Sequence, residues 1–205
     1  VNESAPFPER YPAPYPHTKA LAERYVLAQP GILAVALRPH LIWGPEDPHI
    51  LPRIAARVRK GVLALPGVDK RIDTVYVENA ALAHVLALSE LQGQASCAGK
   101  AYFISNDEPL PQGEIIRRLL GAIGISAEIL PVPAWLAKAA GALCETAWPF
   151  LGLKSEPPVT RFTANQLTTA HWYDISAAKR DMAYRPEFTI AEGLDALQRS
   201  AAGHA

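Results

Sequence analysis

The run ILAVALRP at residues 32–39 constrains the fold of this chain most strongly. It is a continuous apolar stretch of strand length, preceded by the turn pair Pro30–Gly31 and followed by a loop that contains Gly44, Pro45 and Pro48. A strand without alternating polar residues is typically buried on both faces, as in parallel sheets that helices cover. The run therefore predicts a parallel sheet in an α/β fold.

The rest of the chain alternates between strand and helix patterns. Residues 1–14 are rich in proline and predict an extended loop. We expect further strands at 62–67, 72–77, 100–105 and 127–132, and helices at 15–29, 49–60, 78–92, 111–124 and 133–152. Of the tail segments 159–169, 172–184 and 189–201, two have clear helical patterning. This alternation supports the α/β class.

Composition excludes several classes of protein. The chain has 205 residues, 20 basic and 20 acidic side chains and a net charge of zero, which argues against a nucleic-acid partner. Its two cysteines predict neither a disulfide framework nor a zinc site and fit the reducing cytoplasm. The apolar helix at 133–152 contains Lys138, Glu145 and Pro149, so we expect it to be buried or to lie on a membrane surface rather than to span a bilayer.

Tyr15 and Lys19 lie four residues apart at the start of the first predicted helix. Residues at this spacing are neighbours on one helix face, and an ammonium group beside a phenol favours the phenolate, as acid/base catalysis near neutral pH requires. The spacing alone is a weak signal. On the spacing alone, an ordinary helical turn, with Tyr15 packed and Lys19 solvated, is the better explanation.

The neighbouring motifs make a catalytic role the better interpretation. YPHTKALAE (15–23) is followed by ALRPHLIWGPEDPH (36–49), RIDTVYVENAALAH (71–84), GKAYFISNDEP (99–109) and EPPVTRFTANQLTTAHWYDISAAKRDMAYRP (156–186). In this order the motifs closely resemble the extended short-chain dehydrogenase/reductases, and within them the 3β-hydroxysteroid dehydrogenase/isomerase group. The resemblance extends over essentially the whole chain.

The resemblance implies a role for each matching residue. Tyr15 would be the catalytic acid/base, and Lys19 its partner on the ribose of NAD or NADP. The loop formed by Pro39, His40, Leu41 and Ile42 would lie along the nicotinamide and its ribose. The substrate pocket would include Trp43, His49, Arg71 and Tyr76. The fold of the chain would be the C-terminal part of a Rossmann-type parallel sheet with a mostly helical substrate lobe, the N-terminal strands being absent.

Other residues have simpler explanations. We expect Arg38 to anchor the loop that follows it, and Asn79 to cap a helix. The glycines of GAIG (121–124) are expected to end a helix, and His84 and His171 to be structural histidines.

The chain contains no phosphate-binding loop. None of its 13 glycines forms GxGxxG or GxxGxxG, whereas the family carries this motif upstream of the tyrosine. We therefore expect residues 1–110 to be a remnant of the nucleotide-binding domain with interleaved substrate-lobe segments, and residues 111–205 to be mainly the substrate lobe and closing helices. Two consequences are weak binding of NAD(P) by this chain alone and an uncovered apolar face on residues 15–37.

The leading hypothesis is a fragment of an NAD(P)-dependent oxidoreductase that interconverts a secondary alcohol and a ketone on a hydrophobic substrate, such as a sterol or a long-chain 3-hydroxy/3-oxo acid. Sugar-nucleotide epimerases or dehydratases of the same superfamily, and an inactive relic or binding module, are the alternatives. The cysteines favour a cytoplasmic enzyme, the apolar helix at 133–152 suits a membrane surface, and the resemblance implies a homodimer.

Overall fold

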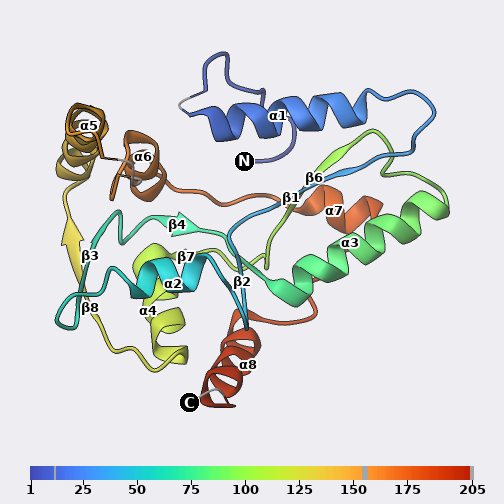
Figure 1. The fold of residues 1–205 in the computed structure, drawn as a ribbon. Coiled ribbons are helices and arrows are strands. Elements are labelled where there is room, and N and C mark those ends of the chain that lie inside the picture. Colours follow the sequence, from blue (N-terminus) through green and yellow to red (C-terminus); the bar gives the residue numbers. More distant parts are fainter. Residues whose placement is uncertain (12, 154–156, 204–205) are drawn as a thin grey trace. The chain divides into compact units, whose positions relative to one another are not determined.

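The computed structural model describes residues 1–11, 13–153 and 157–203 and contains two compact units (Figure 1). Unit 1 consists of Val1–Pro52, Asp73–Pro109 and Trp172–Ala205, and unit 2 of Arg53–Ile72 and Leu110–His171. The units thus interleave along the chain. Which of them binds nucleotide and which binds substrate stays a prediction. Pro12 of the predicted N-terminal loop and Glu156 of the EPPVTRF stretch lie outside the described residues.

Unit 1 contains two parallel strand pairs. β1 (Ala36–Pro39) pairs with β6 (Ala101–Ile104), and β2 (Ile42–Trp43) pairs with β5 (Val75–Tyr76). Its helices are α1 (Pro14–Leu27), α2 (Ile50–Ala55, at the boundary with unit 2), α3 (Val77–Gln92), α7 (Ser176–Asp181) and α8 (Ile190–Gly203). The parallel pairing and the α/β class are as predicted.

The prediction that the apolar run of residues 32–39 is a strand buried on both faces is wrong. The strand begins only at Ala36, its four residues are half-buried, and Ile32 and Leu33 before it are 65% and 61% exposed. Within the described residues β1 has a single neighbouring strand, β6. The run therefore lacks the second neighbour that a central strand has.

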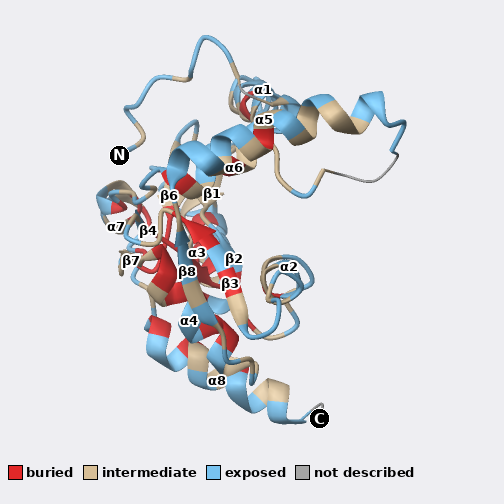
Figure 2. Cartoon of the chain, turned by 90° about the vertical axis from the view of Figure 1, so that its left-hand side faces the viewer, coloured by how far each residue is buried: buried red, intermediate tan, exposed pale blue. Residues whose placement is uncertain are grey.

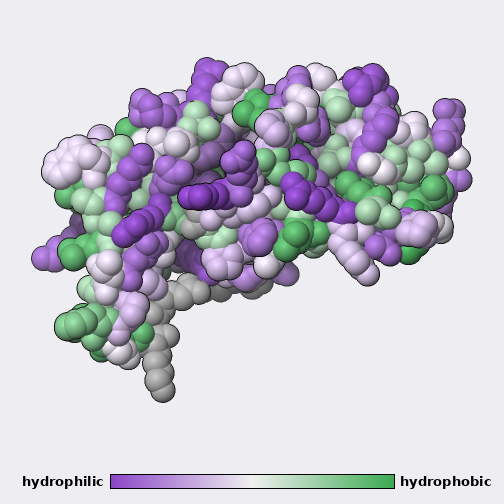
Figure 3. All heavy atoms as spheres, turned by 90° about the horizontal axis from the view of Figure 1, so that it is seen from above, coloured by the Kyte–Doolittle hydropathy of each residue, from purple (hydrophilic) through white to green (hydrophobic). Residues whose placement is uncertain are grey.

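The expected uncovered apolar face is confirmed. On α1, Leu21, Tyr25 and Val26 are exposed, and the exposed Ile32 and Leu33 follow in sequence. The surface seen from above shows scattered hydrophobic side chains, in green, among hydrophilic ones (Figure 3).

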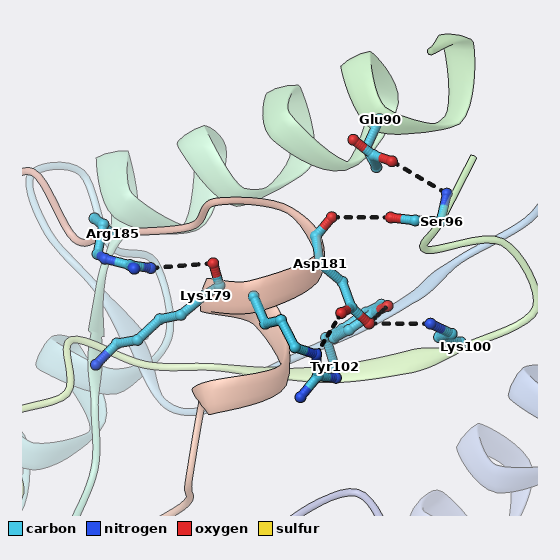
Figure 4. Close-up of polar contacts among 8 residues, drawn as sticks. Glu90, Ser96, Lys100, Tyr102, Lys179, Asp181 and Arg185 are labelled. Carbon is cyan, nitrogen blue, oxygen red and sulfur yellow. Dashed lines mark hydrogen bonds and ion pairs between the residues drawn. The ribbon is translucent and has the colours of Figure 1, made fainter. Parts of the chain in front are cut away.

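The core of unit 1 lies between α3, α7 and the β1–β6 pair. Its buried members come from five segments of the sequence: Val75, Ala80, Ala83, Ala87, Cys97, Tyr102, Ile104, Ile175, Ala178, Met182 and Tyr184. The small alanines of α3 let the helix approach the strands closely. Asp181 holds α7 in place, since its side chain accepts hydrogen bonds from Tyr102 Oη (2.7 Å) and Lys100 Nζ (3.1 Å) (Figure 4).

Unit 2 is built around the parallel pair of β3 (Val62–Pro66) and β8 (Glu128–Val132). α4 (Gln112–Ala122) supplies Ile116 and Leu120 to a core shared with Leu63 and Leu65. β4 (Arg71–Ile72) and β7 (Leu110–Pro111) form a short antiparallel pair. α5 (Ala134–Phe150) packs against α6 (Arg161–Thr168), whose N-terminus is capped by the Thr160 hydroxyl.

Two local predictions concern unit 2. Gly124 has a φ of +76° after the C-cap of α4, and the amide of Ile125 donates to the carbonyl of Leu120 (2.9 Å), so Gly124 ends the helix as expected. Gly121 lies inside α4, so the prediction is wrong for this glycine. α5 is mostly exposed or half-buried along its length (Figure 2). Among the residues described, no helix is both long and apolar enough to cross a lipid bilayer.

Candidate active site

Tyr15 and Lys19 lie in the first turns of α1, and both side chains are exposed. Pro14 begins the helix, where a missing amide hydrogen costs nothing. The helix is fixed to β1 by an ion pair in which the Arg38 guanidinium donates two hydrogen bonds, of 2.8 and 2.6 Å, to the Glu23 carboxylate. Glu23 lies four residues after Lys19, so the fixed part of α1 directly follows the candidate catalytic pair.

Arg38 therefore has a structural role that differs from the expected one. It anchors the helix that carries Tyr15 rather than the loop that follows β1. Its guanidinium also lies 5.4 Å from the ring centroid of Phe7 and 5.2 Å from that of Phe103. The paired carboxylate keeps the pKa of Arg38 above its ordinary value, so the group stays charged.

The loop of residues 39–42 follows the carboxyl end of β1. The amide of His40 donates to the carbonyl of Ile104 (3.2 Å), which continues the β1–β6 ladder by one residue. Leu41 has a φ of +48°, a conformation that costs a non-glycine residue about 1–3 kcal/mol and persists only where the surroundings hold it. Leu41 and Ile42 are each more than a third exposed. Ligands of open α/β sheets bind at this end of the strands.

Trp43 and Tyr76 are buried in unit 1, at 1% and 2% exposure. Their rings are 5.4 Å apart, and Trp43 Nε1 donates to the hydroxyl of Thr74 (3.0 Å). A Cβ at Gly193 of α8 would approach both rings to within 3 Å, so only glycine allows α8 to pack here. Both aromatic residues thus have structural roles. Their contact with a substrate stays a prediction.

His49 and Arg71 lie in different units. His49 is an exposed residue just before α2, and its amide, like those of Ile50 and Leu51, donates to the Asp47 carboxylate. Arg71 is an exposed residue of β4 in unit 2, and its carbonyl accepts from the amide of His171. The predicted substrate roles of His49 and Arg71 stay open.

Asn79 does not cap α3, contrary to expectation. It is completely buried inside the helix, and its Oδ1 accepts from the amides of Glu187 and Phe188 (2.9 and 3.1 Å). Its Nδ2 donates to Asn106 Oδ1 and to the Phe188 carbonyl. Asn106 follows β6 and also accepts from the amide of Tyr76. The two amides therefore connect the ends of β5 and β6 with the segment that leads into α8.

Asp73 is a second buried polar residue that sequence reasoning did not single out as important. It is 1% exposed, and its Oδ2 accepts from the amide of Tyr173 (2.8 Å). Burial raises the pKa of its carboxyl group. An acidic residue within the apolar pattern IDTVYV was the available signal, because such a group is buried only with a partner.

The chain matches the model of the 3-beta hydroxysteroid dehydrogenase/isomerase family over residues 1–132. This match includes α1, the loop of residues 39–42 and both strand pairs of unit 1. The chain belongs to this family.

Curated relatives share much of this sequence. A 2-alkyl-3-oxoalkanoate reductase from Stenotrophomonas maltophilia is 49% identical over 98% of this chain and 62% of its own length. A decarboxylating sterol-4-alpha-carboxylate 3-dehydrogenase from Bos taurus is 32% identical over 91% of this chain and 54% of its own length. The chain thus spans between half and two thirds of these relatives.

Solved structures support the Rossmann-type fold. The NADPH complex of RMD from Pseudomonas aeruginosa aligns with 98% of this chain and 62% of its own, at a TM-score of 0.63 and 18% identity. The NAD complex of UDP-glucose 4-epimerase from Thermus thermophilus aligns with all of this chain and 60% of its own, at a TM-score of 0.63 and 22% identity. At these identities the likeness concerns the fold alone.

The described residues fit one end of a nicotinamide dinucleotide. Exposed Tyr15 and Lys19 and the partly exposed loop of residues 39–42 offer a hydroxyl, an ammonium group and a strand end to a ribose and its attached ring. The pyrophosphate needs a glycine-rich turn between a strand and a helix N-terminus, and the sequence has no such motif. The groups predicted to hold the cofactor therefore concern its nicotinamide half.

Proposed function

We propose that this chain supplies the Tyr/Lys pair and the substrate lobe of an NAD(P)-dependent oxidoreductase. The enzyme would interconvert a secondary alcohol and a ketone on a hydrophobic substrate, of the class of sterols or long-chain 3-hydroxy/3-oxo acids. The observation that carries the proposal is the exposed Tyr15–Lys19 pair on a helix that Glu23 and Arg38 fix to the strand before the loop of residues 39–42.

Each group has a defined task in the reduction direction. The Tyr15 hydroxyl donates its proton to the carbonyl oxygen of the substrate, and the Lys19 ammonium favours the resulting phenolate. Lys19 also binds a ribose hydroxyl, and residues 39–42 orient the nicotinamide end. The bound cofactor supplies the hydride that the carbonyl carbon accepts. In the oxidation direction the phenolate of Tyr15 takes the proton back.

The substrate class rests on the relatives and on the surface of α5. The two curated relatives described above are named for a 3-oxoalkanoate and a sterol carboxylate, both largely apolar molecules. On α5, Trp135, Leu143 and Phe150 are 71%, 68% and 91% exposed, and their spacing of eight and seven residues gives one apolar stripe. Such a stripe suits an apolar substrate or a membrane surface. We place the enzyme in the cytoplasm, where α5 can meet a membrane from its aqueous side.

A homodimer is also part of the proposal. Exposed apolar residues of α1 and α3, among them Tyr25, Val85 and Leu88, would be covered in such a pair. Light scattering coupled to gel filtration of the enzyme would give a mass of two chains.

Replacement of the catalytic hydroxyl tests the reaction. In the enzyme that contains this chain, Tyr15→Phe should lower kcat by about 10²–10⁴-fold while the Kd of NAD(P)H changes less than about threefold, because the phenol acts only in proton transfer. Tyr25→Phe, also an exposed tyrosine of α1, is the matched control and should retain activity. Undiminished turnover by Tyr15→Phe would refute the assigned role.

A further inference from the structure

Tyr173 contacts the loop of residues 39–42 although it lies more than 130 positions away. Its ring stacks on Phe103 of β6, with centroids 4.1 Å apart and an interplanar angle of 21°. The same ring meets His40 edge-on, with centroids 5.0 Å apart and an angle of 66°. His40 is thus held from the side by an aromatic ring that itself rests on the neighbouring strand.

The main chain at Tyr173 is fixed by a buried carboxylate. Its amide donates to Asp73 Oδ2 (2.8 Å), and Asp73 is 1% exposed. Residues 172–175 are not helical, and the helical pattern of residues 172–184 becomes a helix only at Ser176. The Tyr173 ring therefore starts from a fixed backbone position, which limits where it can lie.

A series of contacts joins the Tyr173 ring to the helix of the candidate catalytic pair. The Arg38 guanidinium lies 5.2 Å from the centroid of Phe103 and is bonded to Glu23 of α1. Contacts consequently run from α1 through Arg38, Phe103 and Tyr173 to His40. All these residues belong to unit 1.

We propose that Tyr173 is a positioning residue that holds His40, and with it the loop of residues 39–42, in the conformation that receives the nicotinamide end of the cofactor. The link to the cofactor rests on the proposed function. Tyr173 acts through His40, whose neighbour Leu41 has the strained φ of +48° that requires support from its surroundings. The ring performs this task, so phenylalanine at position 173 should serve as well as tyrosine.

Hydrogen exchange in this chain tests the contact without any activity. In Tyr173→Leu, which keeps an apolar side chain but removes the ring, we expect the amides of residues 40–42 to exchange at least fivefold faster than in the wild type. Tyr173→Phe should restore wild-type exchange. Trp172→Leu is the matched control, because it removes a half-exposed ring from the adjacent position. Equal exchange in Tyr173→Leu and the wild type would overturn the proposal.

Kinetics of the enzyme that contains this chain test whether the held loop matters for binding of the cofactor. Tyr173→Leu should raise KM for NAD(P)H about 3–10-fold, and Tyr173→Phe should return it to the wild-type value, a rescue that loss of folded protein cannot mimic. Faster exchange with unchanged KM would separate the loop from the cofactor and overturn the proposal. If Tyr173→Leu does not fold, Phe103→Leu is the second variant, because it removes the ring on which Tyr173 stacks. It should also speed exchange of residues 40–42 and raise KM. Unchanged exchange and KM in Phe103→Leu would overturn the proposal. A wild-type enzyme without reductase activity would refute the proposed function, while the exchange comparison would still decide whether Tyr173 holds the loop.

Discussion

Asp181 offers the sharpest test of the forces that hold unit 1 together. Its side chain is 10% exposed and accepts from Arg180 Nε (2.7 Å), Tyr102 Oη (2.7 Å) and Lys100 Nζ (3.1 Å). These donors, with Arg180 contributing most, lower the pKa of the carboxyl group to about 2. Figure 4 shows the carboxylate pointing toward Tyr102 and Lys100 from the end of α7. Replacing it with asparagine keeps the shape and removes the charge.

The size of the effect follows from the pKa. The ordinary value is about 3.9, so a folded value of about 2 corresponds to at most about 2.6 kcal/mol of stability at neutral pH. Lys100 and Arg180 are 52% and 69% exposed, and solvent screens their share. We therefore expect Asp181→Asn to lower the free energy of unfolding by about 1–1.5 kcal/mol at pH 7.

The pH dependence has a defined sign. The folded-state pKa lies below the unfolded one, so the carboxylate stabilises the fold fully above pH about 4, and this contribution is lost as the pH falls toward about 2. Urea unfolding of the chain, followed by circular dichroism at several pH values between 7 and 2.5, would measure it. The difference between wild type and Asp181→Asn should shrink steadily below pH about 4. Asp195→Asn, at an exposed position of α8, is the control. A difference that does not change with pH would refute the electrostatic argument.

Three further predictions concern the core, the cofactor and α5. Asn79→Ala leaves the amides of Glu187 and Phe188 without their partner and should cost about 2–4 kcal/mol in urea unfolding, whereas Asn165→Ala at an exposed helix position should change stability by less than about 0.5 kcal/mol. Calorimetric titration of these 205 residues with NAD⁺, NADH and NADPH should give no binding tighter than about millimolar, because the pyrophosphate has no glycine-rich turn, and micromolar binding would contradict this. Trp135→Ser combined with Phe150→Ser should reduce sedimentation of the chain with phosphatidylcholine vesicles several-fold, whereas Trp172→Ser should not, and equal sedimentation of all variants would exclude a role of α5 at membranes.

The class of fold could be predicted because the sequence pattern is local. The apolar run before Arg38, Gly124 after α4 and the alanine-rich pattern of α3 each specify an element within a few residues of themselves. The length of β1 could not be predicted in this way. Residues 32–35 have strand composition, but a strand exists only where a neighbour supplies hydrogen bonds, and β6 pairs only with residues 36–39.

The residues of the candidate site also differ in whether a local sequence pattern or distant partners determine their role. Tyr15, Lys19 and the loop after β1 could be proposed from the sequence because short motifs carry them. The importance of Asn79, Asp73 and Tyr173 could not be predicted, because it depends on partners 27 to 133 positions away. A buried amide is indistinguishable in sequence from an exposed helix cap until its partners are known. Polar residues within apolar patterns are the only sequence signal of such networks, and they do not name the partner.

The residues with distant partners and the loop of residues 39–42 both contact β6 in unit 1. Asn106 follows β6 and Tyr173 packs on β6, so two distant segments are both fixed to the strand beside β1. The loop of residues 39–42 follows β1 and contacts β6 through His40. A loop with a strained residue can be kept in one conformation only by rigid surroundings, and buried, fully bonded amides are among the most rigid groups a core can provide. The residues whose importance the sequence did not reveal therefore support the ones proposed from it, and a change at either asparagine should reach the loop through β6.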